Sequence, residues 1–346
     1  MTRAPVQAPD IGAGRVELSH GAGGRAMAQM IRDLFARELG NAWLAQGDDS
    51  VRLPAAAGRL AVSTDVHVVS PLFFPGGDIG CLSVHGTVND VAMAGARPLW
   101  LTAGFVLEEG FPLADLARIV ASMAEASRAA GVPVVAGDTK VVERGKADGV
   151  FIATTGIGAI RDGVEVSGAN ARAGDAVLVS GPIGDHGMAI MSLREHLGFE
   201  SPIVSDTAPL HDLVARLLDA VPGVHVLRDP TRGGLAATLN EIAHQSGVGI
   251  VLDEARIPVR PAVAAACELL GIDPLDVACE GRMIVICPAQ DAERARAALR
   301  AAPLGRGAEI VGEVVEDARR FVRMRTRFGG QRMVDWLAGA ALPRIC

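Results

Sequence analysis

The sequence predicts an α/β (α+β) protein built from two domains. At 346 residues the chain is longer than one hydrophobic core usually holds together. Apolar residues at helical spacing alternate with short runs of β-branched residues, a pattern typical of helices alternating with strands. A turn-rich break at 163–174 separates two such series, so we expect an N-terminal domain over 15–162 and a C-terminal domain over 163–316.

The N-terminal domain is expected to follow a flexible segment at 1–14 that is rich in Pro, Ala and Gly. Met30, Leu34 and Leu39 have helical spacing, so the first helix is expected over 29–39. The further helices are expected at 79–94 and 113–130, and the strands at 60–63, 99–107, 132–136 and 150–160.

The C-terminal domain repeats the mixture of elements without repeating the sequence itself. Its helices are expected near 187–197, 207–220, 233–246, 261–270 and 290–301, and its strands near 176–179, 249–252, 283–287 and 309–315. The two halves therefore predict two α/β domains of similar build.

The composition excludes several classes of protein. Hydrophobic residues make up 49% of the chain, yet no apolar run is long enough to span a bilayer, and no signal segment opens it. Aromatic residues are only 3%, so few side chains could stack on bases, and the net charge of -7 does not suit a protein that neutralises backbone phosphates. Nucleic acid is therefore not expected as a partner. Five widely spaced cysteines give neither a disulfide framework nor zinc-ligand spacing. We therefore expect a cytoplasmic protein without a membrane segment.

The last cysteine ends a segment whose composition differs from that of the two expected domains. Arginines crowd the region after Glu316, so a mobile C-terminal tail is expected over 317–346. Cys346 is the final residue, and Pro343 stiffens the approach to it. Arg344 adds a positive charge near the thiol, whose thiolate is the reactive form. The tail is therefore expected to carry a reactive sulfur.

Aspartates recur at the ends of expected strands and in glycine turns, where side chains reach into clefts. Mg²⁺ takes oxygen ligands from a few carboxylates, while water and substrate phosphates complete its shell. Any one of these residues could instead cap a helix or a turn. As a set they predict a site for divalent cations and, through them, a nucleotide; the metal candidates are Asp49, Asp65, Asp90, Asp138 and Asp229.

Two glycine-rich loops precede expected helices. The first is Ser19-His20-Gly21-Ala22-Gly23-Gly24, and the second is Thr231-Arg232-Gly233-Gly234. Backbone N–H groups at a helix N-terminus attract anions, so both loops are candidates for phosphate binding. Neither loop has the Walker pattern or the Gly-x-Gly-x-x-Gly pattern after a strand, so each is a weak signal alone.

Three side chains are candidates for proton transfer. Lys140 follows Asp138 by two residues, His225 lies on the strand before Asp229, and Glu280 precedes an apolar strand. A glutamate in apolar surroundings can acquire a raised pKa suited to acid–base chemistry. The alternative for each residue is a structural ion pair or hydrogen bond, and this alternative suits His225 best.

A series of short motifs extends along nearly the whole chain. In order they are Ser63-Thr64-Asp65, then 71–80, 86–92, 137–142, 184–187 and 228–236, and finally Pro343-Arg344-Ile345-Cys346. Together they resemble the HypE family of carbamoyl dehydratases, hydrogenase maturation factors of the PurM-like aminoimidazole ribonucleotide synthetase superfamily. The internal motifs are shared across that superfamily, whereas the Pro-Arg-Ile-Cys ending is specific to this family.

The resemblance implies a fold and a set of site residues. The fold would be two-domain and PurM-like, with an N-terminal ATP-binding and dimerisation domain, a C-terminal α/β domain and the mobile tail. ATP and Mg²⁺ would bind in a cleft of the N-terminal domain. The nucleotide-binding candidates are His20, Gly21, Gly23, Gly24, Asp48, Thr64, Asn89, Lys140, Arg232 and Gly233, and the catalytic candidates are Cys346, Lys140, Glu280 and His225.

The resemblance also implies a reaction and its partners. The carbamoyltransferase HypF would place a carbamoyl group on Cys346 of a homodimeric enzyme. ATP would phosphorylate the carboxamide oxygen, and a base would remove the nitrogen proton, which leaves a thiocyanate. Cyanide would then pass to iron on the HypC–HypD complex for the [NiFe]-hydrogenase. The identity of the base, the number of magnesium ions and the subunit in which the tail acts stay open.

Two other functions are compatible with parts of the sequence. The first is another ATP-using member of the superfamily, but thiamine-phosphate kinase and aminoimidazole ribonucleotide synthetase have no use for a terminal thiol. Selenophosphate synthetase needs a reactive cysteine near its N-terminus, and no cysteine precedes Cys81. The second is a non-catalytic scaffold in metal-centre assembly that ATP switches, whose Cys346 binds a metal or a partner; a lone cysteine is a weak metal site.

Overall fold

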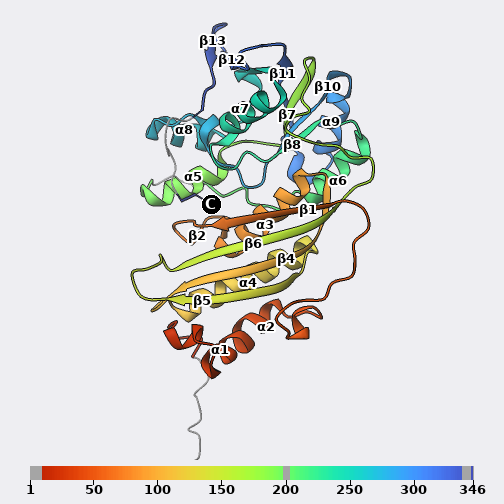
Figure 1. Cartoon of the computed structure of the whole chain (residues 1–346). Coiled ribbons are helices and arrows are strands. Elements are labelled where there is room, and N and C mark those ends of the chain that lie inside the picture. The colour runs from red at the N-terminus through yellow and green to blue at the C-terminus, as the bar shows by residue number, and fades with distance from the viewer. Residues whose placement is uncertain (1–9, 198–202, 337–343, 346) are drawn as a thin grey trace, which may run out of the picture.

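The computed structural model describes residues 10–197, 203–336, 344 and 345, and Figure 1 shows them as two stacked domains. The N-terminal domain contains α1 (Arg25–Met30), α2 (Ala36–Leu39), β1 (Leu60–His67), β2 (Phe73–Phe74), β3 (Gly77–Asp78), α3 (Ile79–Met93), β4 (Ala96–Glu108), α4 (Leu113–Ala130), β5 (Val134–Val142) and β6 (Val150–Ile160). The C-terminal domain contains β7 (Asp175–Val179), α5 (Asp185–Arg194), α6 (His211–Ala220), β8 (Val226–Arg228), α7 (Gly234–Ser246), β9 (Gly249–Asp253), α8 (Pro261–Leu270), β10 (Ile284–Pro288), α9 (Ala292–Arg300), β11 (Glu309–Val315), β12 (Val322–Arg325) and β13 (Gln331–Met333).

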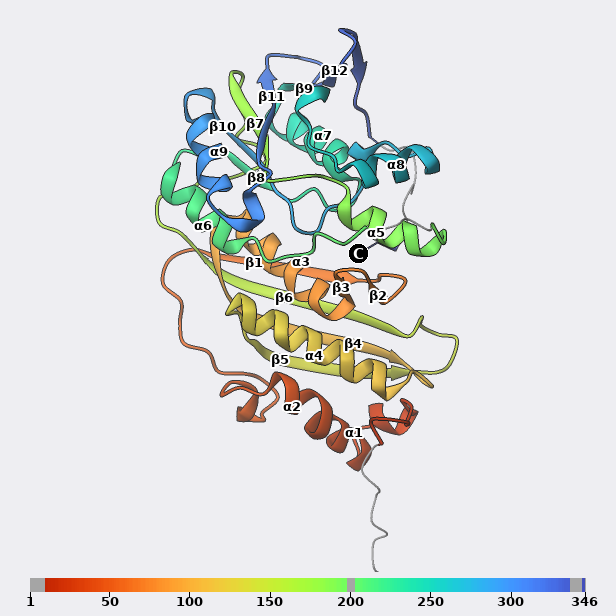
Figure 2. The ribbon, with the colours of Figure 1, turned by 180° about the vertical axis from the view of Figure 1, so that it is seen from behind.

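A mixed sheet in the order β1-β6-β4-β5 forms the centre of the N-terminal domain. β6 pairs antiparallel with β1 and β4, while β4 and β5 are parallel. α3 and α4 lie behind the sheet in Figure 1 and in front of it in Figure 2. α3 begins where the Asp78 carboxylate accepts hydrogen bonds from the N–H groups of Gly80 and Cys81. α4 ends at Gly131, whose positive φ stops the helix.

The other face of this sheet is turned toward the viewer in Figure 1, and no described helix covers it. Leu60, Val62 and Val66 of β1 lie on it with exposed fractions of 52%, 65% and 56%. The alternate residues of β1 face α3, because successive side chains of a strand point to opposite faces. A row of exposed aliphatic side chains is typical of a surface that another protein chain covers.

The sheet of the C-terminal domain has the order β13-β12-β9-β11-β7-β10-β8 and is covered by helices on both faces. One face packs against α7 through residues such as Leu235 and Leu239. The other packs against α6 and α9 through Leu217 and Leu299. The central strands β7, β9 and β10 are buried along almost their whole length, as continuous apolar strands between two helical layers should be.

The C-terminal domain continues beyond the boundary expected at residue 316. β12 pairs in parallel with β9, and β13 pairs antiparallel with β12. Val322 and Met324 are buried in the domain core, whereas Arg325 is exposed and forms an ion pair with Glu313. The arginine-rich composition therefore concealed a strand whose alternate residues face the core. Residues 317–336 belong to the sheet and its flanking loops.

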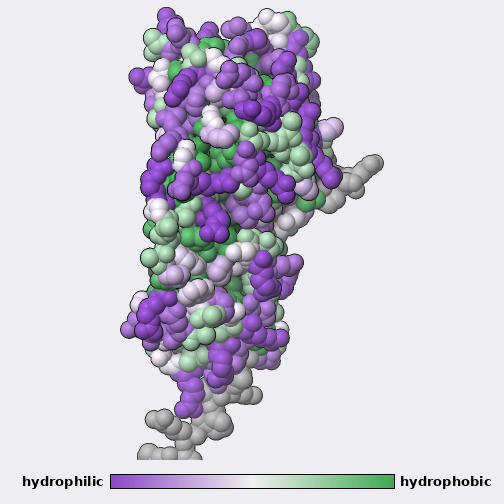
Figure 3. Space-filling view, turned by 90° about the vertical axis from the view of Figure 1, so that its right-hand side faces the viewer, coloured by the Kyte–Doolittle hydropathy of each residue, from purple (hydrophilic) through white to green (hydrophobic). Residues whose placement is uncertain are grey.

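The first expected helix is interrupted. α1 and α2 are joined by a π-helical turn at Ile31–Phe35, in which the hydrogen bonds skip one additional residue. Most other elements match their expected bounds within a few residues. In the described ranges, no helix is both long and apolar enough to cross a membrane. Figure 3 shows one side of the molecule, where hydrophilic side chains predominate and hydrophobic ones gather in smaller patches.

Candidate functional site

Acidic side chains from both domains meet where the domains touch. Asp65 comes from β1, Asp90 from α3, Asp229 from the loop after β8, and Glu280 from the segment before β10. Asp65 lies on the face of β1 that packs against α3, since Val66 beside it points to the open face. Asp90 is held by the hydroxyl of Ser63, which donates a 2.7 Å hydrogen bond to its Oδ2 atom.

A glycine on α3 permits this convergence. A Cβ atom at Gly86 would lie 3.0 Å from His67 Cε1, 3.6 Å from Asp65 Oδ2 and 3.8 Å from Glu280 Oε2. These groups therefore surround one point on the helix surface, although they come from two separate segments, β1 and the segment before β10. The absence of a side chain at Gly86 is what allows them to approach each other.

Glu280 is fixed by its backbone. Its N–H donates to Asp206 Oδ1 at 3.1 Å, and its carbonyl accepts from the Asn89 amide at 3.1 Å. The adjacent N–H of Cys279 donates to the carbonyl of Pro230, so this segment is tied to the Asp229 loop. The Glu280 side chain is buried, and among the described residues its Oε1 atom has no hydrogen-bond partner.

Burial and mutual repulsion perturb the protonation of these carboxyl groups. Burial, reinforced by the charge of Asp90, raises the pKa of Asp229 to about 7. Burial also raises the pKa of Asp90. The pKa of Glu280 is well above its ordinary value because the group is buried and because Asp229 lies close to it. Burial is the main cause of each shift, and repulsion between the carboxylates adds to it; a bound cation would relieve that repulsion.

The same residues fit a divalent cation that is shared with a phosphate ligand. Asp229 Oδ2, like Glu280 Oε1, is buried without a hydrogen-bond partner in the described chain. In those same residues, no three His, Cys, Asp or Glu side chains are arranged closely enough to form a complete metal site by themselves. Mg²⁺ commonly uses one or two carboxylates and completes its shell with water and substrate phosphates. Asp65, Asp90 and Asp229 therefore suit such a shared ion.

A cavity of about 720 Å³ adjoins this acidic cluster between the two domains. Asp90 lines it from the N-terminal domain, and Asp229 and Arg232 line it from the C-terminal domain. α7 begins beside it, directly after Gly233, whose positive φ of 75° turns the chain into the helix. An aspartate pair, an arginine and a helix N-terminus together form a suitable environment for a phosphate with its cation.

The structure brings a second group of candidates together at the far edge of the N-terminal sheet. Lys140 and Asp138 of β5 form a 2.8 Å ion pair, which lowers the pKa of Asp138. The glycine loop lies against this strand, since a Cβ atom at Gly21 would be 2.9 Å from Val141. β6 and β4 separate β5 from β1, so within one chain this group does not reach the acidic cluster. The members of the group are Lys140, Asp138, His20, Gly21, Gly23 and Gly24.

Several predicted residues lie elsewhere or have other partners. Asp48 and Asp49 are exposed, and Asp48 forms an ion pair with Arg52 at 2.6 Å. Thr64 lies on the open face of β1, where its hydroxyl is 2.8 Å from that of Thr155. These three residues are therefore outside the acidic cluster of their own chain.

Asn89 and His225 have structural roles. Asn89 is buried, and its amide donates to the carbonyls of Ala208 and Glu280 and accepts from the N–H of Leu210. Both of its N–H groups are thus engaged inside the protein, which favours a structural role over contact with a nucleotide. The Nδ1 atom of His225 is 2.8 Å from the buried carboxylate of Asp175, at the other end of β8 from Asp229. The structural alternative therefore describes His225 better than proton transfer does.

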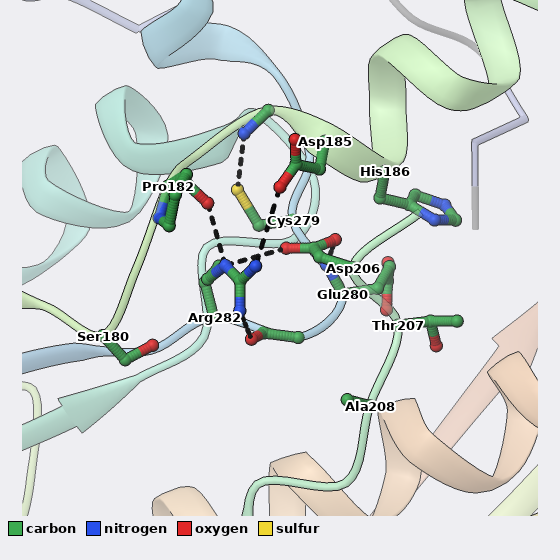
Figure 4. A network of polar contacts seen from close by, with 12 residues as sticks. Ser180, Pro182, Asp185, His186, Asp206, Thr207, Ala208, Cys279, Glu280 and Arg282 are labelled. Carbon is green, nitrogen blue, oxygen red and sulfur yellow. Dashed lines mark hydrogen bonds and ion pairs between the residues drawn. The ribbon is translucent and has the colours of Figure 1, made fainter. Parts of the chain in front are cut away.

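The sequence interpretation missed a polar network behind Glu280, which Figure 4 shows. Arg282 donates to the carbonyl of Pro182 at 2.8 Å and contacts the carboxylates of Asp185 and Asp206 at 3.6 Å and 3.5 Å. Burial raises the pKa of Asp206, and Arg282 opposes this shift. Asp206 gave no signal because it lies in a loop without a recognisable pattern. His67 was detectable, since it follows Asp65 by two residues and thus shares its face of β1.

The end of the tail also reaches this region. Ile345 is buried among core residues of the N-terminal domain, and its carbonyl is 2.9 Å from His186 Nε2. The carbonyl of Arg344 accepts a hydrogen bond from the N–H of Ser70 at 3.2 Å. Cys346, on which the prediction of a reactive thiol rests, lies outside the described residues.

Comparison with known proteins identifies the family. The models for the N-terminal and C-terminal domains of AIR synthase related proteins match residues 47–160 and 172–325. The carbamoyl dehydratase HypE of Cupriavidus necator is 65% identical over 97% of this chain and 96% of its own length. A crystal structure of the hydrogenase maturation protein HypE in complex with ATP has a TM-score of 0.92, at 50% identity over 95% of this chain and 99% of that one.

A crystal structure of a HypE–HypF complex contains a further relative, with a TM-score of 0.79 and 49% identity over 89% of this chain and 99% of that one. These likenesses cover both domains at identities far above those that indicate a shared fold alone. They confirm the expected PurM-like fold and favour a carbamoyl dehydratase over a kinase of the superfamily or a non-catalytic scaffold. The chain therefore belongs to the HypE family of carbamoyl dehydratases.

Proposed function

We propose that this enzyme dehydrates a carbamoyl group on the Cys346 thiol to a thiocyanate at the expense of ATP. The observation that carries the proposal is the buried acidic cluster, in which one oxygen of Asp229 and one of Glu280 have no hydrogen-bond partner among the described residues. The cluster lies next to a cavity that Arg232 and the start of α7 border. The docking of Ile345 in the same subunit supports it, because this residue precedes the proposed sulfur carrier.

The nucleotide is proposed to bind with its phosphates in the cavity. The N–H groups at the start of α7 and the guanidinium of Arg232 would contact phosphate oxygens. Asp65, Asp90 and Asp229 would hold Mg²⁺, which supplies charge neutralisation for the phosphates when it is bound. The relative of known structure was crystallised with ATP, which supports this assignment.

The proposed reaction has two steps. The carboxamide oxygen of the Cys346 carbamoyl group attacks the γ-phosphate of ATP, which releases ADP and one proton and gives a phosphorylated imidate. Removal of the remaining N–H proton then forms the C≡N bond as inorganic phosphate leaves. Phosphate replaces hydroxide as the leaving group, so the barrier to losing oxygen falls.

Glu280 is proposed as the group that receives the nitrogen proton. A carboxyl group whose pKa is raised by burial is a stronger base once it is ionised than an ordinary glutamate. Lys140 is the second candidate, and its ion pair with Asp138 keeps it at the opposite edge of the sheet in its own subunit.

We propose a homodimer in which the edge strand β5 of one subunit contributes to the phosphate site of the other. The open face with Leu60, Val62 and Val66 is suited to packing against the same face of a second copy. A two-fold axis parallel to the strands would place β5 of one subunit opposite β1 of the other. The glycine loop, Asp138 and Lys140 of one chain would then complete the phosphate site of the next.

The partners follow from the same chemistry. HypF is proposed to supply the carbamoyl group, and the structure of a HypE–HypF complex of a relative supports this. The HypC–HypD complex is proposed to accept cyanide on iron for the [NiFe]-hydrogenase, with all steps in the cytoplasm.

Intact-protein mass spectrometry tests the proposal. Protein carbamoylated by HypF is incubated with ATP and magnesium, and the C-terminal peptide should lose the mass of one water. Cys346→Ala should accept no carbamoyl group. Cys81→Ala, which removes a half-buried cysteine elsewhere, should behave as the wild type does. A carbamoyl group on Cys346→Ala would identify another acceptor and refute the proposal.

A further inference from the structure

The last described residues of the chain are held by a set of side chains that receive their backbone. The carbonyl of Ile345 is 2.9 Å from His186 Nε2, and the Ile345 side chain is only 3% exposed. The carbonyl of Arg344 accepts from the N–H of Ser70 and from the guanidinium of Arg194. The Arg344 side chain forms an ion pair with Asp148. Both backbone carbonyls and both side chains are therefore engaged.

The hydrogen bonds around His186 determine which ring nitrogen carries the proton. A carbonyl oxygen only accepts, so Nε2 must be the donor to Ile345. Nδ1 is then an acceptor and receives the hydroxyl of Ser205 at 2.7 Å, while Ser205 Oγ accepts from the N–H of Thr207 at 3.1 Å. Burial lowers the pKa of His186 to about 4, which agrees with a neutral ring. Ser205, as a donor to Nδ1, therefore stabilises the tautomer that binds the tail.

The segment that orients His186 also fixes Glu280. Asp206 lies between Ser205 and Thr207, and its carboxylate accepts the N–H of Glu280 at 3.1 Å. Figure 4 shows His186, Asp206 and Glu280 around this one segment. The Phe74 ring packs edge-on against the His186 ring, with centroids 5.4 Å apart, and holds the imidazole from the side. The tail end and Glu280 thus share one rigid support.

We propose that His186 is a positioning residue that binds the carbonyl of Ile345 and thereby seats the end of the tail beside Glu280 of the same subunit for dehydration. This inference rests on the proposed function of Cys346, and it deepens it by assigning the dehydration step to the tail of the subunit that supplies Glu280. The ligand of the docking site is the peptide backbone of the chain itself. Apolar burial of Ile345 gives affinity, whereas the directed hydrogen bond fixes the orientation of the last peptide unit.

Tryptic cleavage after Arg344 measures the docking directly, because a bound and buried Arg344–Ile345 bond must be released before a protease can cut it. His186→Leu removes the donor, and release of the Ile-Cys dipeptide should become about tenfold faster, as expected for one lost hydrogen bond. His186→Gln keeps an N–H donor and should remain close to the wild type. His244→Leu, at an exposed histidine whose ring contacts Trp336 rather than Ile345, is the control.

Cleavage after the exposed Arg319 and Arg327 serves as an internal reference. If His186→Leu accelerates cleavage at all of these arginines equally, the substitution has loosened the whole fold. The Ser205→Ala variant then tests the docking of the tail end. Ser205→Ala, a smaller change, removes the hydroxyl that donates to His186 Nδ1 and should accelerate only the cleavage after Arg344. Unchanged release of the dipeptide in both His186→Leu and Ser205→Ala would overturn the proposal.

Single-turnover dehydration tests the catalytic consequence. Carbamoylated His186→Leu should form thiocyanate about tenfold more slowly, with unchanged ATP affinity and unchanged carbamoylation by HypF, and His186→Gln should restore most of the rate. If the wild type never forms thiocyanate, the proposed function is refuted, but the tryptic experiment still tests whether His186 binds the tail end. A normal rate in His186→Leu beside an active wild type would refute the positioning role alone.

Co-expressed variants test the assignment to one subunit. A heterodimer of Cys346→Ala and Glu280→Gln chains has one intact tail, but that tail belongs to the subunit that lacks Glu280. No thiocyanate is expected from it if the tail acts in its own subunit. Product from the heterodimer, with none from either variant alone, would show transfer across the dimer and overturn the assignment.

Discussion

Replacing Asn89 with leucine should destabilise the contact between the domains and displace Glu280. The Asn89 amide joins α3 to three backbone groups, namely the carbonyls of Ala208 and Glu280 and the N–H of Leu210, at 3.0, 3.1 and 2.7 Å. Leucine has nearly the same volume but leaves all three groups without their partner. Each buried backbone group that loses its hydrogen bond costs about 1–3 kcal/mol, so we expect Asn89→Leu to lower the free energy of unfolding by roughly 3–5 kcal/mol.

Urea denaturation followed by circular dichroism measures this loss of stability. The rate of dehydration reports whether Glu280 has been displaced. Asn240→Leu is a matched control, since Asn240 is also buried in a helix but only donates, to the carbonyls of Ala236 and Val334. We expect about 1–2 kcal/mol for the control, because fewer groups lose their partner, and little change in dehydration. If Asn89→Leu is no less stable than Asn240→Leu, the reasoning that assigns Asn89 a structural role is refuted.

Three further predictions concern the base, a buried histidine and the open sheet face. Glu280→Gln should slow thiocyanate formation by about a hundredfold or more with little change in ATP affinity, and undiminished dehydration would remove Glu280 from the mechanism. Burial, reinforced by His211, lowers the pKa of His85 to about 4, below its value of 6.5 in the unfolded chain, so acid protonates the unfolded chain first and favours it. The wild type should therefore lose about 2 kcal/mol more than His85→Gln between about pH 7 and pH 5 in urea titrations, and parallel losses would contradict this. Val62→Glu should convert the proposed dimer to a monomer in light scattering, whereas Glu254→Lys, at a distant surface, should not; a persistent Val62→Glu dimer would place the interface elsewhere.

Local sequence patterns predicted the helices and strands that bury one face or both. The helix at 261–270 was expected at the residues where α8 lies, because Pro261 suits a first turn and Gly271 ends a helix with positive φ. β12 was missed because Arg323 and Arg325 dominate its composition, and ion pairs to Asp317 and Glu313 satisfy them only in the folded chain. These pairs form only when β12 is in place beside β9, a strand about 70 residues earlier in the chain, and local patterns do not contain that pairing.

The same limit applies to the site. Asp65, Asp90, Asp229 and Glu280 were expected from their motifs, yet only the packing of β1, α3, the loop after β8 and the segment before β10 brings them together. Asp65 and Glu280 meet at Gly86, and Asp90 and Asp229 line one cavity. The motif around Asn89 does not reveal that both N–H groups of its amide donate to backbone carbonyls of the other domain. His186 was part of a quoted motif, but its contact with Ile345 joins residues 159 positions apart and could not be predicted from spacing.

The fate of the carbamoyl oxygen tests the central chemistry most directly. Protein carbamoylated with a heavy oxygen isotope is incubated with unlabelled ATP, and the released inorganic phosphate is analysed by mass spectrometry. If ATP phosphorylates the carboxamide oxygen, one labelled oxygen must appear in each phosphate for every thiocyanate formed. Label found in water, with unlabelled phosphate, would show that ATP hydrolysis and dehydration are separate events and would contradict the account.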